Sequence, residues 1–256
     1  MTGRTVVHIG CAGWSVPKLN SVVANSEQPD ITPKSHLERY ADSFNAVEIN
    51  SSFYRPHKPA TYTRWRETVP ADFRFSVKIP KIITHQLRLQ NCDSELERFI
   101  FEVGHLAKKL GVLLIQIPPS LRFDADIAQK FFARFTELTA VPLALEARHV
   151  SWFNSTAYEL LQHLQVALVQ ADPSPAGFAA AGVNTAELPR TASTHYVRLH
   201  GSPVVYSSSY DLHYLNNLAE RIRLAKNAGP VWCVFDNTAR GAAFENAAIL
   251  RANLKA

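Results

Sequence analysis

Short apolar runs alternate along this chain with longer segments in which apolar residues recur at helical spacing. Eight of these runs have the length and the β-branched or aromatic content of buried strands. We expect strands at Val6–Cys11, Ala46–Asn50, Phe73–Ile79, Val112–Ile117, Leu143–Arg148, Val166–Ala171, His195–His200 and Val231–Asn237. We expect helices at Lys34–Phe44, Thr61–Thr68, Ser94–Leu110, Asp126–Thr139, Ser155–Leu164, Leu212–Ala228 and Ala242–Leu254.

This alternation favours parallel strands joined by crossover helices, and eight such units in 256 residues favour closure into a barrel. The expected fold is therefore α/β, a single (β/α)8 TIM barrel in one domain over residues 1–256. Two segments depart from regularity: a long loop after the first strand, Ser15–Pro33, and an irregular sixth unit at Ser174–Ser193. An open doubly wound sheet is the alternative, but its glycine fingerprint is missing after the first strand.

The composition, with 46% hydrophobic and 19% charged residues, is typical of a folded globular protein. No apolar stretch is long enough to span a bilayer and the first residues do not resemble a signal peptide, so we expect no membrane partner. Cys11, Cys92 and Cys233 fit neither a disulfide framework nor a zinc spacing, which makes a cytoplasmic location the default. The net charge of +5 favours anionic partners only mildly, because no dense basic stripe is present.

Side chains of a strand alternate between two faces, and in a barrel the apolar set packs against the helices. The opposite set, expected to face the interior, is unusually polar. It comprises His8, Gly10, Glu48, Asn50, Arg74, Ser76, Lys78, Gln116, Glu146, Arg148, Gln170, Asp172, Tyr196, Arg198, His200, Cys233 and Asn237. Barrels ordinarily fill with Val, Ile and Leu, and breaking a buried ion pair costs about 3–5 kcal/mol. Charged groups gathered at the strand ends therefore favour a ligand site over a purely structural role.

Motifs on these strands resemble the YecE-like family, a domain-of-unknown-function family of α/β barrels. They are Ile9–Trp14, Tyr40–Tyr54, Phe75–Lys78, Ile83–His85, Gln116–Ser120, Glu146–Trp152, Tyr196–Gly201, Phe235–Asn237, Gly241–Ala242 and Asn246–Ala247. The resemblance covers almost the whole chain and implies the barrel fold, but it supplies no reaction. This chain has Asp236-Asn237 where the family usually has two asparagines.

Glu48 and Glu146 are the candidates for acid–base chemistry, since a carboxylate beside lysine or arginine stays ionised and suits a base or nucleophile. His200 is the candidate proton donor, with His85 as the alternative. Arginine and lysine suit phosphate or carboxylate groups, and aromatic rings beyond the strand ends could stack on a sugar or a base. The expected ligand-binding residues are Trp14, Asn50, Tyr54, Lys78, His85, Gln116, Arg148, Trp152, Asp172, Arg198 and Asn237, with Tyr206 as a further aromatic.

These residues favour an enzyme, a hydrolase, lyase or isomerase, acting on a small anionic or phosphorylated, sugar-like ligand. The alternatives are a nucleic-acid or nucleotide binder, nuclease-like or not, and a non-catalytic sensor. No cofactor is expected to be required. A divalent metal on Glu48, Glu146, Asp172 and His200 is less favoured, because neighbouring cations compete for the carboxylates.

Overall fold

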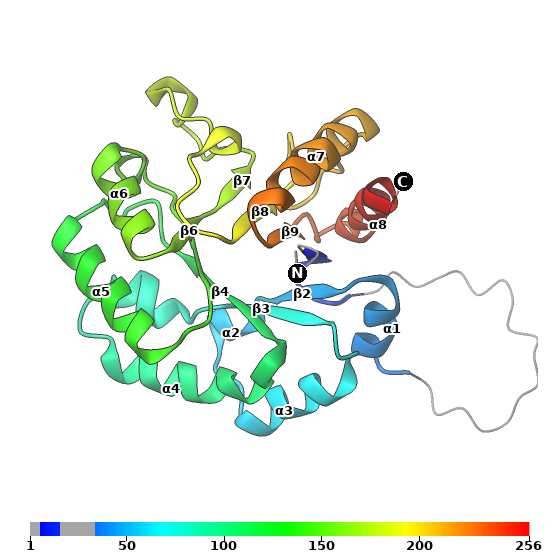
Figure 1. The fold of residues 1–256 in the computed structure, drawn as a ribbon, viewed down its shortest axis with the longest axis horizontal. Helices are drawn as coiled ribbons and strands as arrows, with labels where there is room; N and C mark the ends of the chain where they lie inside the picture. The colour runs from blue at the N-terminus through cyan, green and yellow to red at the C-terminus, as the bar shows by residue number, and fades with distance from the viewer. Residues whose placement is uncertain (1–5, 16–33, 256) are drawn as a thin grey trace, which may run out of the picture.

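The computed structural model describes residues 6–15 and 34–255, and within them parallel strands alternate with helices (Figure 1). The strands are β1 Val7–Cys11, β2 Ala46–Ile49, β3 Arg74–Lys78, β4 Leu110–Gln116, β5 Leu143–Glu146, β6 Val166–Leu168, β7 Gln170–Asp172, β8 His195–Leu199 and β9 Val231–Phe235. The α-helices are α1 His36–Ser43, α2 Ser51–Tyr54, α3 Pro59–Thr68, α4 Asp93–Val103, α5 Ala125–Leu138, α6 Ser155–His163, α7 Leu212–Ala225 and α8 Ala242–Lys255. The predicted α/β class is confirmed.

The sixth unit is irregular, as predicted. Its connection to β8 contains only two short 3-10 turns, Ala179–Ala181 and Thr185–Glu187, and no α-helix. The predicted loop at Ser15–Pro33 lies, apart from Ser15, outside the described residues. In residues 6–15 and 34–255, no helix has both the length and the apolar character that crossing a membrane requires.

The expectation of one closed eight-stranded sheet is wrong. The strands form a four-stranded sheet in the order β1-β9-β8-β7 and a five-stranded sheet in the order β2-β3-β4-β5-β6. Every pair of neighbouring strands within the two sheets is parallel, and the order around both sheets follows the chain. The two sheets meet at two junctions, which we call seams. At the first seam β1 and β2 lie side by side but, in the described residues, share only an isolated bridge between Ala12 and Glu48.

Side chains explain the break between β1 and β2. The hydroxyl of Tyr40 accepts the Cys11 N–H at 2.7 Å and donates to the Ala46 carbonyl at 2.9 Å. The Asn45 amide likewise accepts from Ile9 N–H and donates to a β1 carbonyl. These side chains occupy backbone groups that a continuous ladder would pair directly.

The second seam divides the predicted sixth strand into β6 and β7. Thr191 Oγ1 accepts the Leu168 N–H at 2.9 Å and donates to the Val166 carbonyl at 2.7 Å, so a side chain covers that edge of β6. β6 pairs with β5, whereas β7, one residue further, pairs with β8. The strand therefore changes partners at Val169.

Two apolar clusters lie on opposite faces of the strands. The larger cluster packs the sheets against the surrounding helices and includes Cys233, which the sequence had placed in the interior. The smaller cluster fills the interior with Ala46, Val112, Leu114, Ala144, Ala167, Val169, Ala192, Tyr196, Trp232 and Val234. The interior is therefore apolar over much of its depth, its ionic cluster lies at the carboxyl ends of the strands, and Arg74 and His8 lie toward the amino ends.

Candidate functional site

Arg198, at the end of β8, is the centre of a buried ionic cluster. Its side chain is 1% exposed and meets carboxylates from three other strands. Nε and Nη2 donate to the two oxygens of Glu48 at 3.0 and 2.8 Å. Nη1 donates to Glu146 Oε2 at 2.9 Å, and Nη2 lies 2.9 Å from Asp236 Oδ2. A buried guanidinium without such partners would be strongly destabilising, so the arrangement requires all of these strand ends together.

Glu48 is fully enclosed by its partners. It has no exposed surface, and besides the forked contact with Arg198 it accepts a hydrogen bond from the Tyr196 hydroxyl at 2.9 Å. That hydroxyl also lies 2.8 Å from Ser76 Oγ. With both oxygens engaged, Glu48 is suited to hold Arg198 in place rather than to exchange protons with a ligand.

His200 lies between two carboxylates. Its Nδ1 is 3.1 Å from Asp236 Oδ2 and its Nε2 is 3.1 Å from Glu146 Oε1. Ionised carboxylates only accept hydrogen bonds, so both ring nitrogens must donate and the ring is an imidazolium. The contact of Nε2 with Arg148 Nη2 is longer, at 3.4 Å, and is secondary to the contact with Glu146. Burial lowers the pKa of His200, but Glu146 and Asp236 outweigh burial and raise it.

The two carboxylates that flank His200 are held ionised. Burial would raise the pKa of Glu146, but Arg198, His200 and Arg148 together keep that pKa well below its usual range. The pKa of Asp236 is likewise lowered, because Arg198 and His200 outweigh its burial. Arg148 adds a forked contact to Glu146 Oε1, with distances of 3.0 Å from Nε and 2.7 Å from Nη2.

Lys78, at the end of β3, differs from the other cations of the site. It is 7% exposed, and its Nζ lies 4.2 Å from the centroid of the Phe53 ring. Within the described residues, Nζ forms neither a hydrogen bond nor a salt bridge. Burial, with a further contribution from Arg198, lowers the pKa of Lys78 to about 8. The ring of His85 packs edge-on against Phe53 at 5.1 Å, and burial and the charge of Lys78 lower its pKa.

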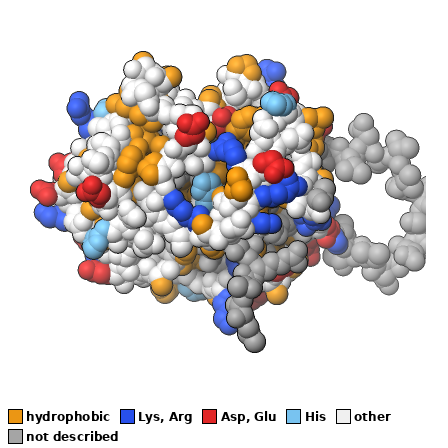
Figure 2. All heavy atoms as spheres, turned by 45° about the horizontal axis from the view of Figure 1, so that its top comes forward, with side chains coloured by type: hydrophobic (Ala, Val, Ile, Leu, Met, Phe, Trp, Pro, Cys, Tyr) orange, Lys and Arg blue, Asp and Glu red, His pale blue; other side chains and the backbone are white. Residues whose placement is uncertain are grey.

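A cavity of about 310 Å³ opens onto this cluster. Glu146, Arg148 and His200 line it, together with Pro119, Ala171, Pro173, Ser174, Pro175, Ala176 and Val205. Figure 2 shows a face of the molecule on which basic, acidic and histidine side chains gather around a hollow. The irregular connection after β7 thus supplies one wall of the cavity, and the ionic cluster supplies the other.

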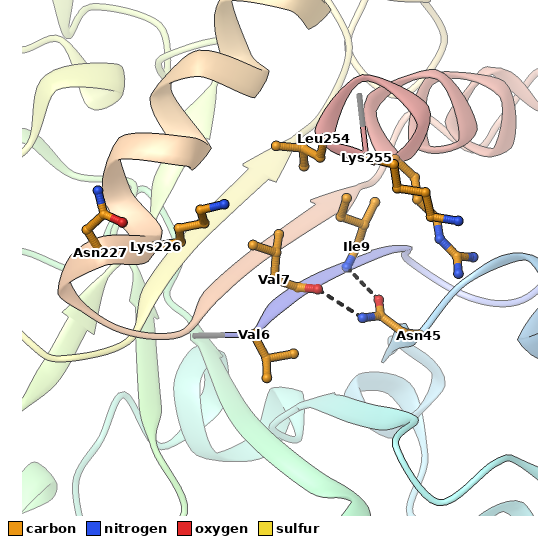
Figure 3. Close-up of a pocket in the computed structure, with 9 residues that line it drawn as sticks. Val6, Val7, Ile9, Asn45, Lys226, Asn227, Leu254 and Lys255 are labelled. Carbon is orange, nitrogen blue, oxygen red and sulfur yellow. Dashed lines mark hydrogen bonds between the residues drawn. The ribbon is translucent and has the colours of Figure 1, made fainter. Parts of the chain in front are cut away.

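A larger cavity of about 640 Å³ lies between the amino end of β1 and α8 (Figure 3). In the part of the chain that the structure describes, its lining includes Lys226, Arg251 and Lys255 but no acidic or histidine side chain. The Asn45 amide that lines it is bonded to the backbone of β1. Among the described residues its charged lining is basic only, whereas the cavity above the ionic cluster combines acidic, basic and histidine side chains and is therefore the candidate functional site.

The structure brings together most of the predicted site residues. Glu48, Glu146, His200, Lys78, Arg148 and Arg198 form the cluster. Gln116 Nε2 lies 3.4 Å from Glu146 Oε1, and Asn50 Nδ2 lies 3.5 Å from Asp236 Oδ1. Asn50 Oδ1 is buried without a partner among the described residues.

Asp172, Asn237 and Gln170 were wrongly assigned to the interior. Asp172 accepts a hydrogen bond from the Tyr210 hydroxyl at 2.8 Å, and Gln170 accepts one from Arg221 of α7. Asn237 donates to Asn246 Oδ1 and to the Ser208 carbonyl, beneath the loop that precedes α7. The inward residues of these strands are their sequence neighbours, a shift of one position that moves a side chain to the opposite face.

Because of this shift the four ligands expected for the alternative metal site do not come together: Asp172 does not join Glu48, Glu146 and His200. In the parts of the chain that the structure describes, no group of three or more His, Cys, Asp or Glu side chains is arranged to hold a metal ion.

The predicted aromatic platform does not form as expected. Trp152 is 1% exposed, donates its indole N–H to the Leu121 carbonyl at 3.0 Å and packs on Phe123, so it is a core residue. Trp14 packs edge-on against Trp65, and Tyr54 is 78% exposed. Of the aromatic residues predicted beyond the strand ends, Tyr206 contacts the site, with its ring edge-on to His200 at 5.6 Å.

Asp236 is the main site residue that the sequence did not assign. It follows β9 directly and bonds both His200 and Arg198. Its departure from the asparagine pair of the family pattern was the available signal. In the structure Asp236 lies on the same face of β9 as Trp232 and Val234, which point into the interior, but the apolar sequence of β9 does not show which of its two faces does so.

Comparisons with known proteins identify relatives of this chain in sequence and in fold. A family model described as "Protein of unknown function DUF72" matches residues 8–256. UPF0759 protein YecE of Escherichia coli K12 is 36% identical over 113 residues, which are 44% of this chain and 38% of that protein. UPF0759 protein YunF of Bacillus subtilis is 30% identical over 162 residues, 60% of this chain and 55% of that protein. The matches thus span about half or less of these curated relatives.

Two solved structures are similar over nearly their whole length. A DUF72 family protein from Thermotoga maritima has a TM-score of 0.78 at 24% identity, covering 98% of this chain and 99% of that one. A DUF72 family protein from Enterococcus faecalis has a TM-score of 0.77 at 20% identity, with 98% of each chain covered. At these identities the likeness shows the fold alone.

Proposed function

Starting from the chain's membership of the DUF72 family of proteins of unknown function, we propose that it is an enzyme that binds a small anionic, sugar-like ligand where its strands end. The observation that carries this proposal is the charge of the buried cluster. Four cations, Arg148, Arg198, protonated His200 and Lys78, face three carboxylates, Glu48, Glu146 and Asp236, which leaves one positive charge in excess.

Arg148 is the cation best placed to meet the ligand. Its side chain is 23% exposed and lines the cavity, whereas Arg198 is buried behind it. A phosphate or carboxylate in the cavity would accept charge-assisted hydrogen bonds from Arg148 and would balance the excess charge. The cavity volume of about 310 Å³ suits a ligand of sugar size.

The chemistry we propose is proton transfer by His200. Its imidazolium lines the cavity and gives a proton to the ligand, and the negative charges of Glu146 and Asp236 then favour its reprotonation by a proton from solvent. Glu146 accepts hydrogen bonds from several donors, so it orients His200 more readily than it attacks a ligand. Glu48 is a positioning residue for Arg198. Hydrolysis, elimination and isomerisation of a sugar-like ligand all need such a proton donor.

The burial of Trp152 removes one of the rings on which the bases of a single strand would stack, which favours a small ligand over a nucleic acid. If the chain instead binds single-stranded or duplex DNA with an affinity that falls steeply with salt, the nucleic-acid alternative gains.

The experiment is a panel of sugar phosphates and sugar acids, with binding measured by calorimetry and turnover by NMR. Arg148→Met should weaken binding of the active ligand by about tenfold or more, since a hydrogen bond to a charged group contributes about 1.5–3 kcal/mol. His200→Asn should retain binding and lose turnover. Arg134→Met, which removes an arginine from the surface of α5, is the matched control. Failure of every anionic ligand to bind, or equal binding by Arg148→Met, refutes the proposal.

A further inference from the structure

Lys78 has a buried amine that the acid–base chemistry above does not use. Its backbone is fixed by β3 and by a hydrogen bond from Ser52 Oγ to its carbonyl at 2.6 Å. Arg198, Arg148 and His200 each bond a carboxylate directly, whereas Nζ of Lys78 has only the face of the Phe53 ring among the described residues. An unpaired, nearly buried lysine has a desolvation cost that a purely structural role leaves unexplained.

We propose that Lys78 is a nucleophile, and that the site takes an aldehyde or ketone bearing an anionic group, which Lys78 binds covalently as an imine. The identity of the anionic group rests on the function proposed above, whereas the reactivity of the amine does not.

The step is balanced without any co-reactant. The lone pair of the neutral Lys78 amine attacks the carbonyl carbon, a C–N bond forms, and the C=O π electrons move to oxygen. The two amine hydrogens leave with that oxygen as water, and a C=N bond remains. Protonation of the imine nitrogen then restores the positive charge that Lys78 carried at this position, above the Phe53 ring and facing the carboxylates of the cluster.

The surroundings of the amine favour this reaction. Glu48, Glu146 and Asp236 are already engaged by Arg198 and its neighbours, so none of them forms a salt bridge with Nζ, and their charges only partly offset the effects of burial and Arg198 on the lysine. Burial and Arg198 lower the pKa of Lys78 from 10.5 to about 8. At pH 7.5 this raises the neutral fraction from about 0.1% to about 24%, a gain of roughly two hundredfold in the attacking species.

The test is reductive trapping of the full-length protein with sodium cyanoborohydride at pH 7.5, followed by intact mass and peptide mapping. The carbonyl probes are dihydroxyacetone phosphate, glyoxylate and uncharged glycolaldehyde. Glycerol 3-phosphate, which is anionic but has no carbonyl group, is the binding control and is measured by calorimetry. Lys78→Arg keeps the charge and lacks the nucleophile, and Lys81→Arg removes an exposed lysine three residues away. Circular dichroism checks that both variants are folded.

The expected result is one dominant adduct at Lys78, labelled at least about tenfold faster than any other lysine, retained in Lys81→Arg and lost in Lys78→Arg. Labelling spread over exposed lysines, or unchanged in folded Lys78→Arg, overturns the proposal.

The two proposals fail separately. If glycerol 3-phosphate binds but no carbonyl probe labels Lys78, the nucleophile is refuted and the anion site stands. If glycolaldehyde labels Lys78 selectively while no anionic compound binds, the nucleophile stands and the anion site is refuted.

Discussion

Replacing Arg198 with methionine should be among the most destabilising single changes in this site. Methionine keeps much of the buried volume but removes the charge that Glu48, Glu146 and Asp236 share. Glu146 and Asp236 would still be paired with His200. Glu48 would keep only the Tyr196 hydroxyl and would be left as an uncompensated charge with no exposed surface.

The size of the destabilisation follows from the buried Glu48 carboxylate, which loses its cationic partner. Breaking a buried ion pair costs about 3–5 kcal/mol. Protonation of that carboxylate would limit the destabilisation of the variant. Taking up a proton at pH 7 costs about 3.7 kcal/mol for a glutamate that titrates near 4.3 in the unfolded chain, and only about 1 kcal/mol at pH 5. We therefore expect a loss of about 3–4 kcal/mol at pH 7 that falls to about 1–2 kcal/mol at pH 5.

Urea unfolding followed by tryptophan fluorescence at both pH values measures this directly. The matched control is Arg134→Met, since Arg134 also contacts three carboxylates, those of Asp93, Glu97 and Glu137, but on the surface. Solvent screening should leave that variant close to the wild type at both pH values. If Arg198→Met unfolds like the control, or if its deficit is the same at pH 5 and pH 7, the description of the cluster as a buried set of ionised groups is wrong.

Three further changes probe other parts of the account. His200→Asn should be destabilised relative to the wild type most strongly below pH 6.5. The pKa of His200 is raised in the folded protein, so the stability that its charge contributes is lost as the pH rises through that pKa. A difference in urea midpoint that widens toward pH 9 would contradict this. Gly10→Ala would place a Cβ atom 1.9 Å from the Ala46 carbonyl oxygen. We therefore expect the variant to lose at least about 3 kcal/mol of folding stability or not to fold, as judged by near-ultraviolet circular dichroism. A wild-type spectrum would refute the close approach of β1 and β2. Trp152→Phe should cost about 1–3 kcal/mol in urea unfolding through its lost hydrogen bond and leave ligand affinity unchanged, whereas weakened binding at full stability would restore its predicted ligand role.

The sequence predicted side-chain direction well where a strand alternates clearly. In β2, Val47 and Ile49 alternate with Ala46 and Glu48, and in β3 Phe75 and Val77 alternate with Ser76 and Lys78. In such strands the apolar residues take the face that packs against the helices, which leaves the other face for the charged residues. The charged residues of β2 and β3 that end at the carboxyl side, Glu48 and Lys78, both join the cluster as expected.

The prediction of side-chain direction failed in the strands that are apolar on both faces. Residues 166–171 read Val-Ala-Leu-Val-Gln-Ala and β9 reads Val-Trp-Cys-Val-Phe, so the sequence does not show which alternate residues face the interior. In each of these strands the predicted inward set was therefore one residue out of register. These two errors misplaced Gln170, Asp172, Asn237 and Cys233 and concealed Asp236.

The break into two sheets could not be predicted from strand patterns at all. It depends on side chains from outside the strands, Tyr40 of α1 with Asn45 at one seam and Thr191 of the irregular connection at the other. Trp152 is a similar case, because its burial depends on where the Leu121 carbonyl returns to meet it. Contacts between distant segments decide these features, and local periodicity carries no information about them.

The protonation state of His200 tests the central claim most directly, since it reports both the ionised cluster and the ligand that the cluster is proposed to bind. Nitrogen NMR of protein labelled at histidine, with His200→Asn for assignment, should show both ring nitrogens of His200 protonated at pH 7. Their resonances should shift when a sugar phosphate is added and stay unchanged with the matching neutral sugar. A neutral imidazole at pH 7, or resonances that no anionic ligand moves, would contradict the account.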